Sequence, residues 1–537
     1  MKKTALELSA LSESLFSAQY PMRSLWQSMA EHFYPERADF TITRNIGAEL
    51  SDSLVDSYPV LIRRDMGNSL SALLRQGDWF DISISGEPDY AGKAWLEWAT
   101  KRQYQFLRNR KSNFVRSTKE GDHDYCTFGQ CVISVEMNRI RDGLLFRCWH
   151  LRDCAWFDDE NGQVGGLSRK WKPKIHELCT IFGEQRLHQK VVERKAKFPF
   201  SEVNCGHIVI PSEMYGDEKL FKFKYVSVWI DFENNHEIAA YGENHFMYVV
   251  PRFQTISGSP YACSPATMVG LPDARTLQAM TFTILEAGER YVRPPLVATH
   301  KVIRGDVDLS PDGITWVDDE YDEKMGAALR PLVQDRGGFP IGFNMKEGLV
   351  NVLRSAFFLD KINLPPADRE MTAYEFSERM KQYRREILPL IAPIESEYNG
   401  QICDAAFTLL MSNGLMGSPY DIPDSLKGKD VEFKFISPLS KSEEEEKVTR
   451  FSIVSKLLKE AAEFDQDVIE NINFDEALRD AVTGSGAPTK WMHDLETVKQ
   501  SRIATAQQRD ALEQAQKAEA QAGTAMAQET QRQIANG

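Results

Sequence analysis

The sequence predicts a helix-rich α+β protein with several domains. Apolar residues recur every three or four positions through most of the chain, whereas the period shifts toward two between about residues 125 and 255. A chain of 537 residues is too long for one hydrophobic core, so we expect two to four domains. Apolar residues make up 42% and charged residues 26%, a balance that excludes wholesale disorder.

The first hundred residues predict helices. Thr4 and Glu7 have the spacing of a capping box, which starts a helix. Glu7 and Glu13 interrupt the apolar stretch that would otherwise resemble a signal peptide, so we expect no export or membrane segment. Pro35 ends the helix that contains Met22 to Phe33. Further helices are expected with apolar stripes at 62–73 and 91–106, with a short strand at 79–82 between them.

An antiparallel region follows, from about 125 to 255. Residues 131–135 and 144–147 have the composition of strands, and a further strand is predicted where Phe221, Phe223 and Tyr225 alternate with lysines. A hairpin tip is expected at 242–244. One helix, at about 175–193, interrupts the strands.

Two long helices with an insert between them are predicted next. The first carries its apolar stripe over 277–291 and ends at Pro294-Pro295, and the second occupies about 345–360. Residues 295–343 have the pattern of strands and turns. Capping boxes at Thr372/Glu375 and Ser442/Glu445 predict two more helix starts, and a strand is expected at 431–436. The Ala- and Gln-rich segment 500–537 has too few large apolar residues to bury a core alone.

The sequence offers no catalytic or metal-binding motif. The eight cysteines form no C-x-x-C pair, so we expect reduced and mostly buried thiols. Asp158 to Gly162 has some features of a calcium loop, but glycine stands where the fifth ligand should be. Neither a Walker A loop nor a G-x-S-x-G elbow occurs. Five residues are close enough in sequence to suggest zinc, although their spacings match no zinc motif: His123, Cys126, Cys131, His150 and Cys154. We therefore expect no cofactor, no metal and no enzyme activity.

An ordered set of short motifs resembles the head-to-tail connector, or portal, proteins of short-tailed bacteriophages. The motifs cover nearly the whole chain up to about 465. In the first half they are Trp26 to Pro35, Asp56, Arg64, Gly67, Trp79-Phe80, Asn113-Phe114 and Phe128-Gly129. In the second half they are Ser264-Pro265-Ala266, Gly270 to Met280, Pro294 to Val297, Met371 to Glu375, Glu395-Ser396-Glu397 and Ser437-Pro438-Leu439. Ala262-Cys263, where the family usually has Gly-Arg, and Tyr374, where a small residue is common, depart from the pattern.

The resemblance implies a portal-type fold and a structural role. Such proteins form homo-oligomeric rings, usually of twelve subunits, at one capsid vertex. Double-stranded DNA is packaged and ejected through the ring, which contacts the terminase motor, tail or adaptor proteins, and capsid and scaffolding proteins. The resemblance therefore implies a virion protein that is made in the host cytoplasm and has no membrane contact.

The family's parts map onto the predicted elements in order. The expected assignment is a wing at 1–265 and 373–440, an outgoing stem helix at 266–294, a clip at 295–343, a returning stem helix at 344–363, a channel loop at 364–372, a crown at 441–499 and a tail at 500–537 that is helical or disordered.

Charge suggests which residues meet DNA and partner proteins. The net charge of −14 argues against tight DNA binding, which needs clustered cations, and suits a channel through which DNA slides. Arg354, Lys361 and Arg369 are the candidate cations on the returning helix and loop, with ordinary surface charge as the alternative. The candidate partner contacts in the clip are acidic: Asp318, Asp319, Glu320, Asp322 and Glu323.

Two other functions are compatible with the sequence. The first is another phage structural component, such as an adaptor or tail-tube protein, which would lack paired long helices around a β insert. The second is a metal-dependent nuclease that uses the carboxylate clusters around Asp158 and Asp318.

Overall fold

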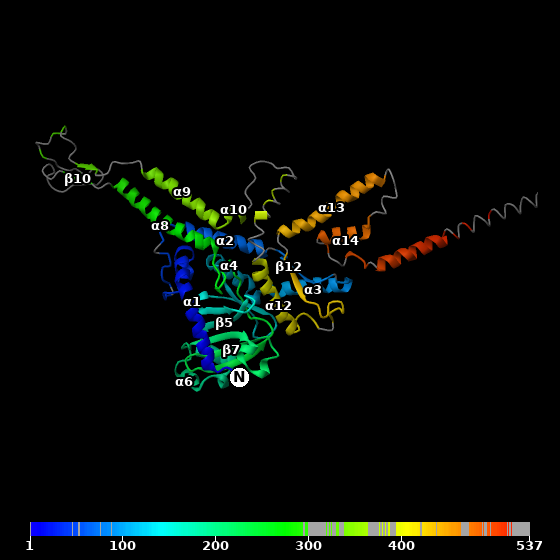
Figure 1. Ribbon diagram of the computed structural model, residues 1–537, viewed down its shortest axis with the longest axis horizontal. Helices are drawn as coiled ribbons and strands as arrows, with labels where there is room; N and C mark the ends of the chain where they lie inside the picture. Colours follow the sequence, from blue (N-terminus) through cyan, green and yellow to red (C-terminus); the bar gives the residue numbers. More distant parts are fainter. Residues whose placement is uncertain are drawn as a thin grey trace, which may run out of the picture. The chain divides into compact units, whose positions relative to one another are not determined.

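The structure of the protein is a computed structural model (Figure 1). It describes residues 2–293 apart from positions 46, 52, 53, 76 and 87, then residues 296–298, 329–331, 338–362, 394–418, 421–435, 438–462 and most of 472–512, with a few single positions elsewhere. The described chain forms two units. One comprises residues 1–79 and 102–417, and the other comprises residues 80–101 and 418–537.

The first unit begins with a long helix, α1 (Ala5–Phe33). The predicted capping box is confirmed, because the Thr4 hydroxyl accepts the Glu7 backbone N–H while the Glu7 carboxylate accepts the Thr4 N–H. The helix continues through Pro21 and ends before Pro35, which opens a short 3₁₀ turn.

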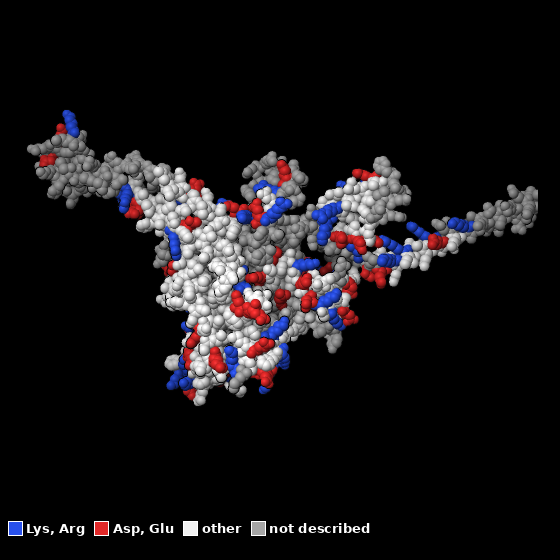
Figure 2. Space-filling model, viewed as in Figure 1, with Lys and Arg blue, Asp and Glu red and all other residues white. Residues whose placement is uncertain are grey.

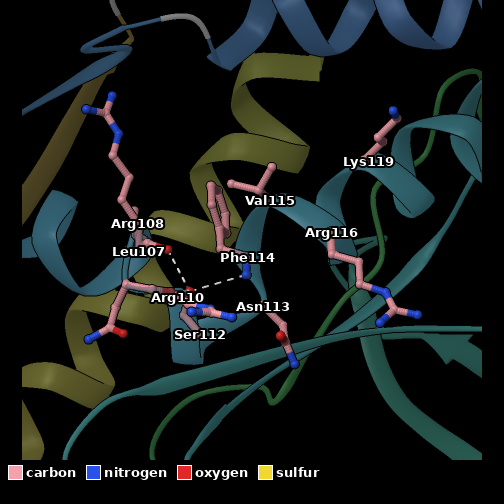
Figure 3. Close-up of a pocket in the computed structure, with 10 residues that line it drawn as sticks. Leu107, Arg108, Arg110, Ser112, Asn113, Phe114, Val115, Arg116 and Lys119 are labelled. Carbon is pink, nitrogen blue, oxygen red and sulfur yellow. Dashed lines mark hydrogen bonds between the residues drawn. The ribbon is translucent and has the colours of Figure 1, made fainter.

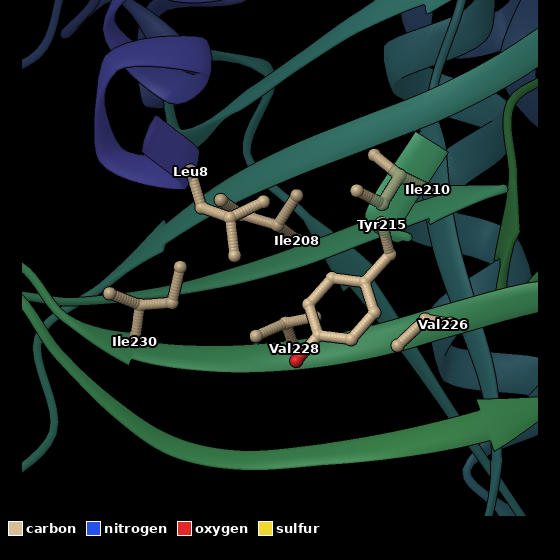
Figure 4. Close-up of a cluster of buried hydrophobic side chains, with 7 residues drawn as sticks. All are labelled: Leu8, Ile208, Ile210, Tyr215, Val226, Val228 and Ile230. Carbon is tan, nitrogen blue, oxygen red and sulfur yellow. The ribbon is translucent and has the colours of Figure 1, made fainter. Parts of the chain in front are cut away.

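The N-terminal part of α1 covers one face of a five-stranded antiparallel sheet. The strands are β4 (Cys154–Asp158), β5 (Val164–Trp171), β6 (Cys205–Pro211), β7 (Tyr225–Asp231) and β8 (His236–Glu243), in that spatial order. Alternate residues of β6 and β7 point to this face, as a period of two requires. Figure 4 shows the resulting apolar cluster, in which Leu8 of α1 and Tyr215 of the short helix α7 (Ser212–Tyr215) pack with Ile208, Ile210, Val226, Val228 and Ile230.

Two short helices line the opposite face of this sheet. They are α5 (Ile175–Phe182) and α6 (Gln189–Lys197), and their core includes Trp229 of β7. The single helix predicted over 175–193 is therefore wrong. Gly183 adopts a positive φ of 81°, which ends α5 and turns the chain before α6 begins.

A separate three-stranded sheet has the order β3-β2-β9, with β2 at Val132–Met137, β3 at Leu144–Trp149 and β9 at Tyr248–Val249. The predicted hairpin tip at 242–244 is wrong, because Gly242 and Glu243 belong to β8 and the next strand pairs with β2 in the other sheet. The strand predicted at 221–225 is also wrong, since β7 begins only at Tyr225. Phe221 precedes it in a turn and is exposed, so alternation there did not reflect a buried face.

Two helices pack against each other through buried polar side chains. These are α2 (Tyr58–Arg75) and α4 (Phe114–Phe128). The Arg75 guanidinium donates to both oxygens of Asp122 at 2.8 Å, and the side chains are 6% and 0% exposed. Although burial alone lowers the pKa of Arg75, the Asp122 carboxylate raises it above its ordinary value. Arg63 donates to Nδ1 of His123 at 3.1 Å. Because an arginine side chain has no acceptor, Nδ1 of His123 must be the unprotonated ring nitrogen.

The predicted helix pair is present. The helix α8 (Pro265–Val292) leads to the short strand β10 (Leu296–Ala298), which pairs antiparallel with β11 (Leu329–Pro331). The returning helix α9 (Gly338–Ala356) begins earlier than expected, and α10 (Leu359–Ile362) follows after a turn at Phe357 and Phe358. Figure 1 shows α8 and α9 side by side, with β10 beyond the end of α8 that is far from the sheets.

A π-helical turn over Glu395–Gly400 precedes α12 (Gln401–Ser412), which ends at Asn413-Gly414 as predicted. The Tyr398 ring is buried, and its centroid lies 4.4 Å from the Arg75 guanidinium. The capping box predicted at Thr372 lies outside the described residues.

The second unit contains a strand pair and helices. Its strands are β1 (Phe80–Ile84) and β12 (Val431–Phe435), which pair antiparallel with Ile82 opposite Phe433. The helix α3 (Tyr90–Leu107) starts in this unit and continues into the first. The C-terminal helices include α13 (Pro438–Ala462) and α14 (Phe474–Gly484), and residues 496–512 are also helical. The helix start predicted at Ser442 is wrong, because α13 begins at Pro438, where a missing N–H costs nothing.

Candidate functional site: the paired long helices

Helices α8 and α9 pack against each other in antiparallel register. A Cβ atom added at Gly270 of α8 would lie 3.3 Å from Leu353 and 3.4 Å from Phe357, near the C-terminal end of α9. Toward the other end, a Cβ added at Gly342 of α9 would lie 3.4 Å from Ile284 of α8. The two helices therefore lie close together at both positions, with room for a Cβ at Gly342 and slightly less room at Gly270.

Backbone acceptors of α4 hold the start of α8 in place. The Ser264 hydroxyl caps α8 and donates to the Cys126 carbonyl at 2.6 Å, while the Thr267 hydroxyl donates to the Thr127 carbonyl at 2.5 Å. All of these groups are buried in the described structure. The residue that follows α4, Gly129, also lies against the segment that leads into α8. A Cβ added at Gly129 would come within 2.3 Å of the Cys263 backbone. The base of the helix pair is thus fixed to the body of the first unit.

Asp56 connects both helices to the segment before α2. One carboxylate oxygen accepts the Thr281 hydroxyl of α8 at 3.0 Å and pairs with the Lys346 ammonium of α9 at 2.8 Å. The Gln278 side chain of α8 accepts the Asp56 N–H at 2.8 Å and donates to its carbonyl at 2.7 Å. Burial acts to raise the pKa of Asp56, but the hydrogen bonds from Lys346, the Tyr58 N–H and Thr281 outweigh it and lower that pKa.

An apolar face of the helix pair is left uncovered in the single chain. Figure 2 shows mostly uncharged surface along α8 and α9 on the side in view. The large apolar side chains that are 41–76% exposed on the two helices are Met268, Val269, Phe282, Leu285, Tyr291, Val292, Ile341, Phe343, Met345 and Val352. Large apolar side chains exposed in such number on two paired helices mark a protein contact more often than a solvated surface.

Two of the three candidate channel cations lie in the described structure. Arg354 is on α9, and its Nε lies 2.7 Å from the Asp360 carboxylate, so it forms an exposed ion pair on the same chain. Lys361 is exposed on α10. Arg369 lies outside the described residues. The structure therefore places Arg354 and Lys361 near the same end of the helix pair.

Only part of the acidic run predicted as a partner contact is described. Asp318 is partly buried, and Asp322 is exposed and accepts the Lys324 N–H at 3.0 Å. Asp319, Glu320 and Glu323 lie outside the described residues.

The candidate metal ligands are not brought together. His150 accepts the Arg152 N–H on Nδ1, and its Nε2 lies 2.7 Å from Asp39. Burial raises the pKa of the Cys126 and Cys154 thiols above the ordinary value, which keeps them protonated. Among the described residues, no group of three or more His, Cys, Asp or Glu side chains could hold a metal ion.

Asp158, in the segment with features of a calcium loop, pairs with an arginine side chain. Its carboxylate accepts two hydrogen bonds from Arg252, at 3.1 and 3.2 Å. Asp159 accepts the N–H groups of Asn161 and Gln163 at 2.9 Å, so the calcium-like segment forms a tight turn between β4 and β5.

Sequence reasoning missed the residues that join the helix pair to the body. Asp56 was found only as part of a family motif, and Gln278 lay in the middle of another motif. No sequence pattern predicted a role for Lys346, because nothing in the sequence indicates that residue 346 lies beside residue 56. The spacing of Gln278 and Thr281, three residues apart on one helix face, was the one local hint of a shared partner.

Comparisons with known proteins identify the family of the chain. The chain is 20% identical over 481 residues to a portal protein of Salmonella phage epsilon15, an alignment that covers 85% of this chain and 83% of that protein. No described helix is long and apolar enough to cross a membrane. The match to the family described as bacteriophage head to tail connecting protein covers residues 5–492, well over half of the sequence. The chain therefore belongs to the bacteriophage head to tail connecting protein family.

Proposed function

We propose that the protein is the portal subunit of a short-tailed bacteriophage. Copies of the chain assemble into a ring, twelve in number, at one vertex of the capsid, and double-stranded DNA enters and leaves through the central channel. The observation that carries this proposal is the family match over residues 5–492 together with the similarity to a portal protein. Neither an adaptor or tail-tube protein nor a nuclease is favoured by these comparisons.

The uncovered face of α8 and α9 supports ring assembly. A closed ring is built from one interface repeated head to tail, so each copy offers two different surfaces. The exposed side chains of Phe282 and Leu285 on α8 and of Ile341 and Met345 on α9 would be removed from water by neighbouring copies. Helices suit such a wall because all their backbone groups except those at the ends are hydrogen-bonded internally, which leaves no strand edge exposed.

Within this proposal, the parts of the chain have separate tasks. Helices α8 and α9 form the stem around the channel, residues 295–343 form the clip that meets the terminase and then the tail proteins, and residues 364–372 narrow the channel. Residues 1–265 and 373–440 form the wing, and residues 441–499 form the crown. The acidic run at 318–323 offers a basic partner protein complementary charge.

The net charge suits DNA transport. Each phosphate contact releases counterions and adds binding free energy, which slows sliding. Each chain has a net charge of −14, so a channel wall with few cations lets DNA pass. Where the channel is narrow, the candidate DNA contacts are Arg354, Lys361 and Arg369. The chain has no catalytic task in this proposal. It is made in the host cytoplasm and becomes part of the virion.

Electron microscopy of the purified chain tests ring formation. We expect rings with a central hole wide enough for duplex DNA. Replacing Phe282 and Leu285 by aspartate should leave monomers or incomplete rings, because each neighbouring copy would then bury two charges. The control is Ile181→Asp on α5, whose side chain is similarly exposed, at 56%, but lies outside the helix pair. Monomers of the unaltered chain under all assembly conditions would contradict the proposal.

A further inference from the structure

A basic cavity lies between α3 and α4. It has a volume of about 430 Å³ and is lined by residues between Leu107 and Lys119. Figure 3 shows four cations around it: Arg108 and Arg110 from the turn after α3, and Arg116 and Lys119 from the first turns of α4. The lining contains no carboxylate.

The positive charge of this segment contrasts with the rest of the chain. Between Arg102 and Lys119 there is a run of cations without any Asp or Glu, whereas the whole chain carries a net charge of −14. A local concentration of one sign creates a potential that attracts the opposite charge, whatever the net charge of the protein.

Three of the four cations around the cavity, Arg110, Arg116 and Lys119, are available to an external anion. The Arg110 and Lys119 side chains are exposed and form no hydrogen bond or ion pair with any residue that the structure describes. The Arg116 side chain is 82% exposed and contacts Glu120 at 3.3 Å. Arg108 is more constrained: its side chain is 51% exposed, lies 3.6 Å from Asp78, donates to the Gly77 carbonyl and stacks over the Tyr104 ring. Exposed pairs of this kind contribute little free energy, so they do not prevent binding of a multivalent anion.

The backbone that carries these cations is held firmly. Phe114, at the first position of α4, is buried and lies nearly parallel to Trp79, with an interplanar angle of 4° and centroids 6.4 Å apart. It also packs edge-on against Phe146, at 5.1 Å. The buried Ser112 hydroxyl donates to the Leu107 carbonyl at 2.7 Å and accepts the Phe114 N–H at 3.2 Å. The cations therefore extend from a fixed base.

We propose that this basic cavity binds the phosphate backbone of double-stranded DNA. The proposal rests on the proposed portal function, in which the protein stands beside packaged DNA. Figure 3 shows that the cationic groups diverge: Arg108 and Lys119 extend on either side of Val115, and Arg116 extends in another direction. Divergent cations can each meet a different phosphate along the rigid, regularly spaced backbone of a duplex. The binding is weak, independent of base sequence and sensitive to salt.

Fluorescence anisotropy with a labelled duplex of about 30 base pairs tests the site on the full-length chain. The variant is Arg110→Ala/Arg116→Ala/Lys119→Ala, which we expect to bind at least about tenfold more weakly at low salt. The slope of log affinity against log salt should fall by about 2 to 3, roughly one for each phosphate that no longer meets a cation. The control is Lys172→Ala/Lys190→Ala/Lys197→Ala, which removes the same charge from exposed positions elsewhere and should retain the wild-type affinity and slope.

Several outcomes would overturn the site. They are an equal loss of affinity in the control variant, an unchanged salt slope in the cavity variant, or binding of a labelled polyglutamate peptide that is tighter than binding of the duplex. The single change Arg110→Glu, at an exposed residue with no described partner, provides a second test in case the triple variant is poorly folded, and it should also weaken duplex binding. Ring formation is scored separately by microscopy. Cavity-dependent DNA binding by a chain that forms no ring would therefore contradict the portal function and not this site.

Discussion

The ammonium nitrogen of Lys346 on α9 lies 2.8 Å from a carboxylate oxygen of Asp56, in the segment that leads into α2. The same oxygen accepts the Thr281 hydroxyl of α8. One carboxylate thus joins both long helices to the body of the protein, in addition to the hydrogen bonds that hold the start of α8 to α4.

Asp56→Asn should destabilise the attachment of the helix pair. The change removes the ion pair and weakens the hydrogen bonds at a carboxylate that is 11% exposed, so we expect a loss of about 1–3 kcal/mol in the free energy of unfolding. Because the pKa of Asp56 is lowered in the fold, its contribution is present at neutral pH and is lost only as the pH falls below about 4. Denaturant unfolding at neutral pH and at lower pH measures both effects.

The control for that change is Asp65→Asn on the exposed side of α2, where the side chain is 58% exposed. It should alter stability by less than about 0.5 kcal/mol. Equal effects of the two substitutions would show that Asp56 does not anchor the helices.

Asp122→Asn should be more damaging, because it leaves the buried Arg75 guanidinium without a counter-charge. We expect a loss of about 3–5 kcal/mol, measured as a lower unfolding temperature and midpoint. Glu120→Gln, in the exposed pair with Arg116, is the control and should cost less than about 0.5 kcal/mol. A stable Asp122→Asn protein with normal α2–α4 packing would refute this account of the pair.

Gly129→Ala should destabilise the protein by at least about 2 kcal/mol. The residue has φ of 76°, which disfavours a side chain, and a Cβ would meet the Cys263 backbone at 2.3 Å. Gly348→Ala in α9 is a matched control, because a Cβ there meets nothing within 4 Å. Alanine should stabilise α9 by about 0.5–1 kcal/mol. Thermal unfolding of the two variants should therefore shift in opposite directions.

Stability should decline as the pH falls from about 6.5 toward 4, and His123 should account for part of the decline. Burial, and then the charge of Arg63, lower the pKa of His123 to about 4. The unfolded chain takes up the proton near pH 6.5, whereas the folded chain resists it, so protonation favours unfolding over this range. His123→Gln should flatten the dependence of melting temperature on pH, while Gly348→Ala, which changes no titratable group, should not. An identical pH profile in His123→Gln would contradict the prediction.

Deleting residues 364–370 should leave ring assembly intact and impair DNA packaging or retention. The reason is the proposed role of this loop in narrowing the channel, separate from the contacts along α8 and α9. Electron microscopy would count rings, and a packaging assay would measure the protected DNA. Failure of ring assembly would show that the loop supports the interface instead.

Local patterns in the sequence were sufficient for several elements. The Thr4–Glu7 capping box, the end of α12 at Asn413-Gly414 and the existence of two long helices around a β insert depend on neighbouring residues alone. Periodicity was insufficient at 221–225, where alternating phenylalanines form a turn, and at 175–193, where Gly183 divides the helix. Tertiary packing decided the outcome at 221–225, and the positive φ of Gly183 decided it at 175–193.

The sequence by itself determined the fold class, the helix pair and the family. These follow from hydrophobic period, caps and ordered motifs, all of which are encoded within short windows of the chain. Only the tertiary structure decided that Asp56 meets Lys346, that β1 pairs with β12, and that Arg110 and Lys119 face an open cavity without partners among the described residues. Such relationships join residues hundreds of positions apart or depend on which side chains remain exposed. Both are set by the packing of the whole chain, because burial and proximity are properties of the fold and not of local sequence.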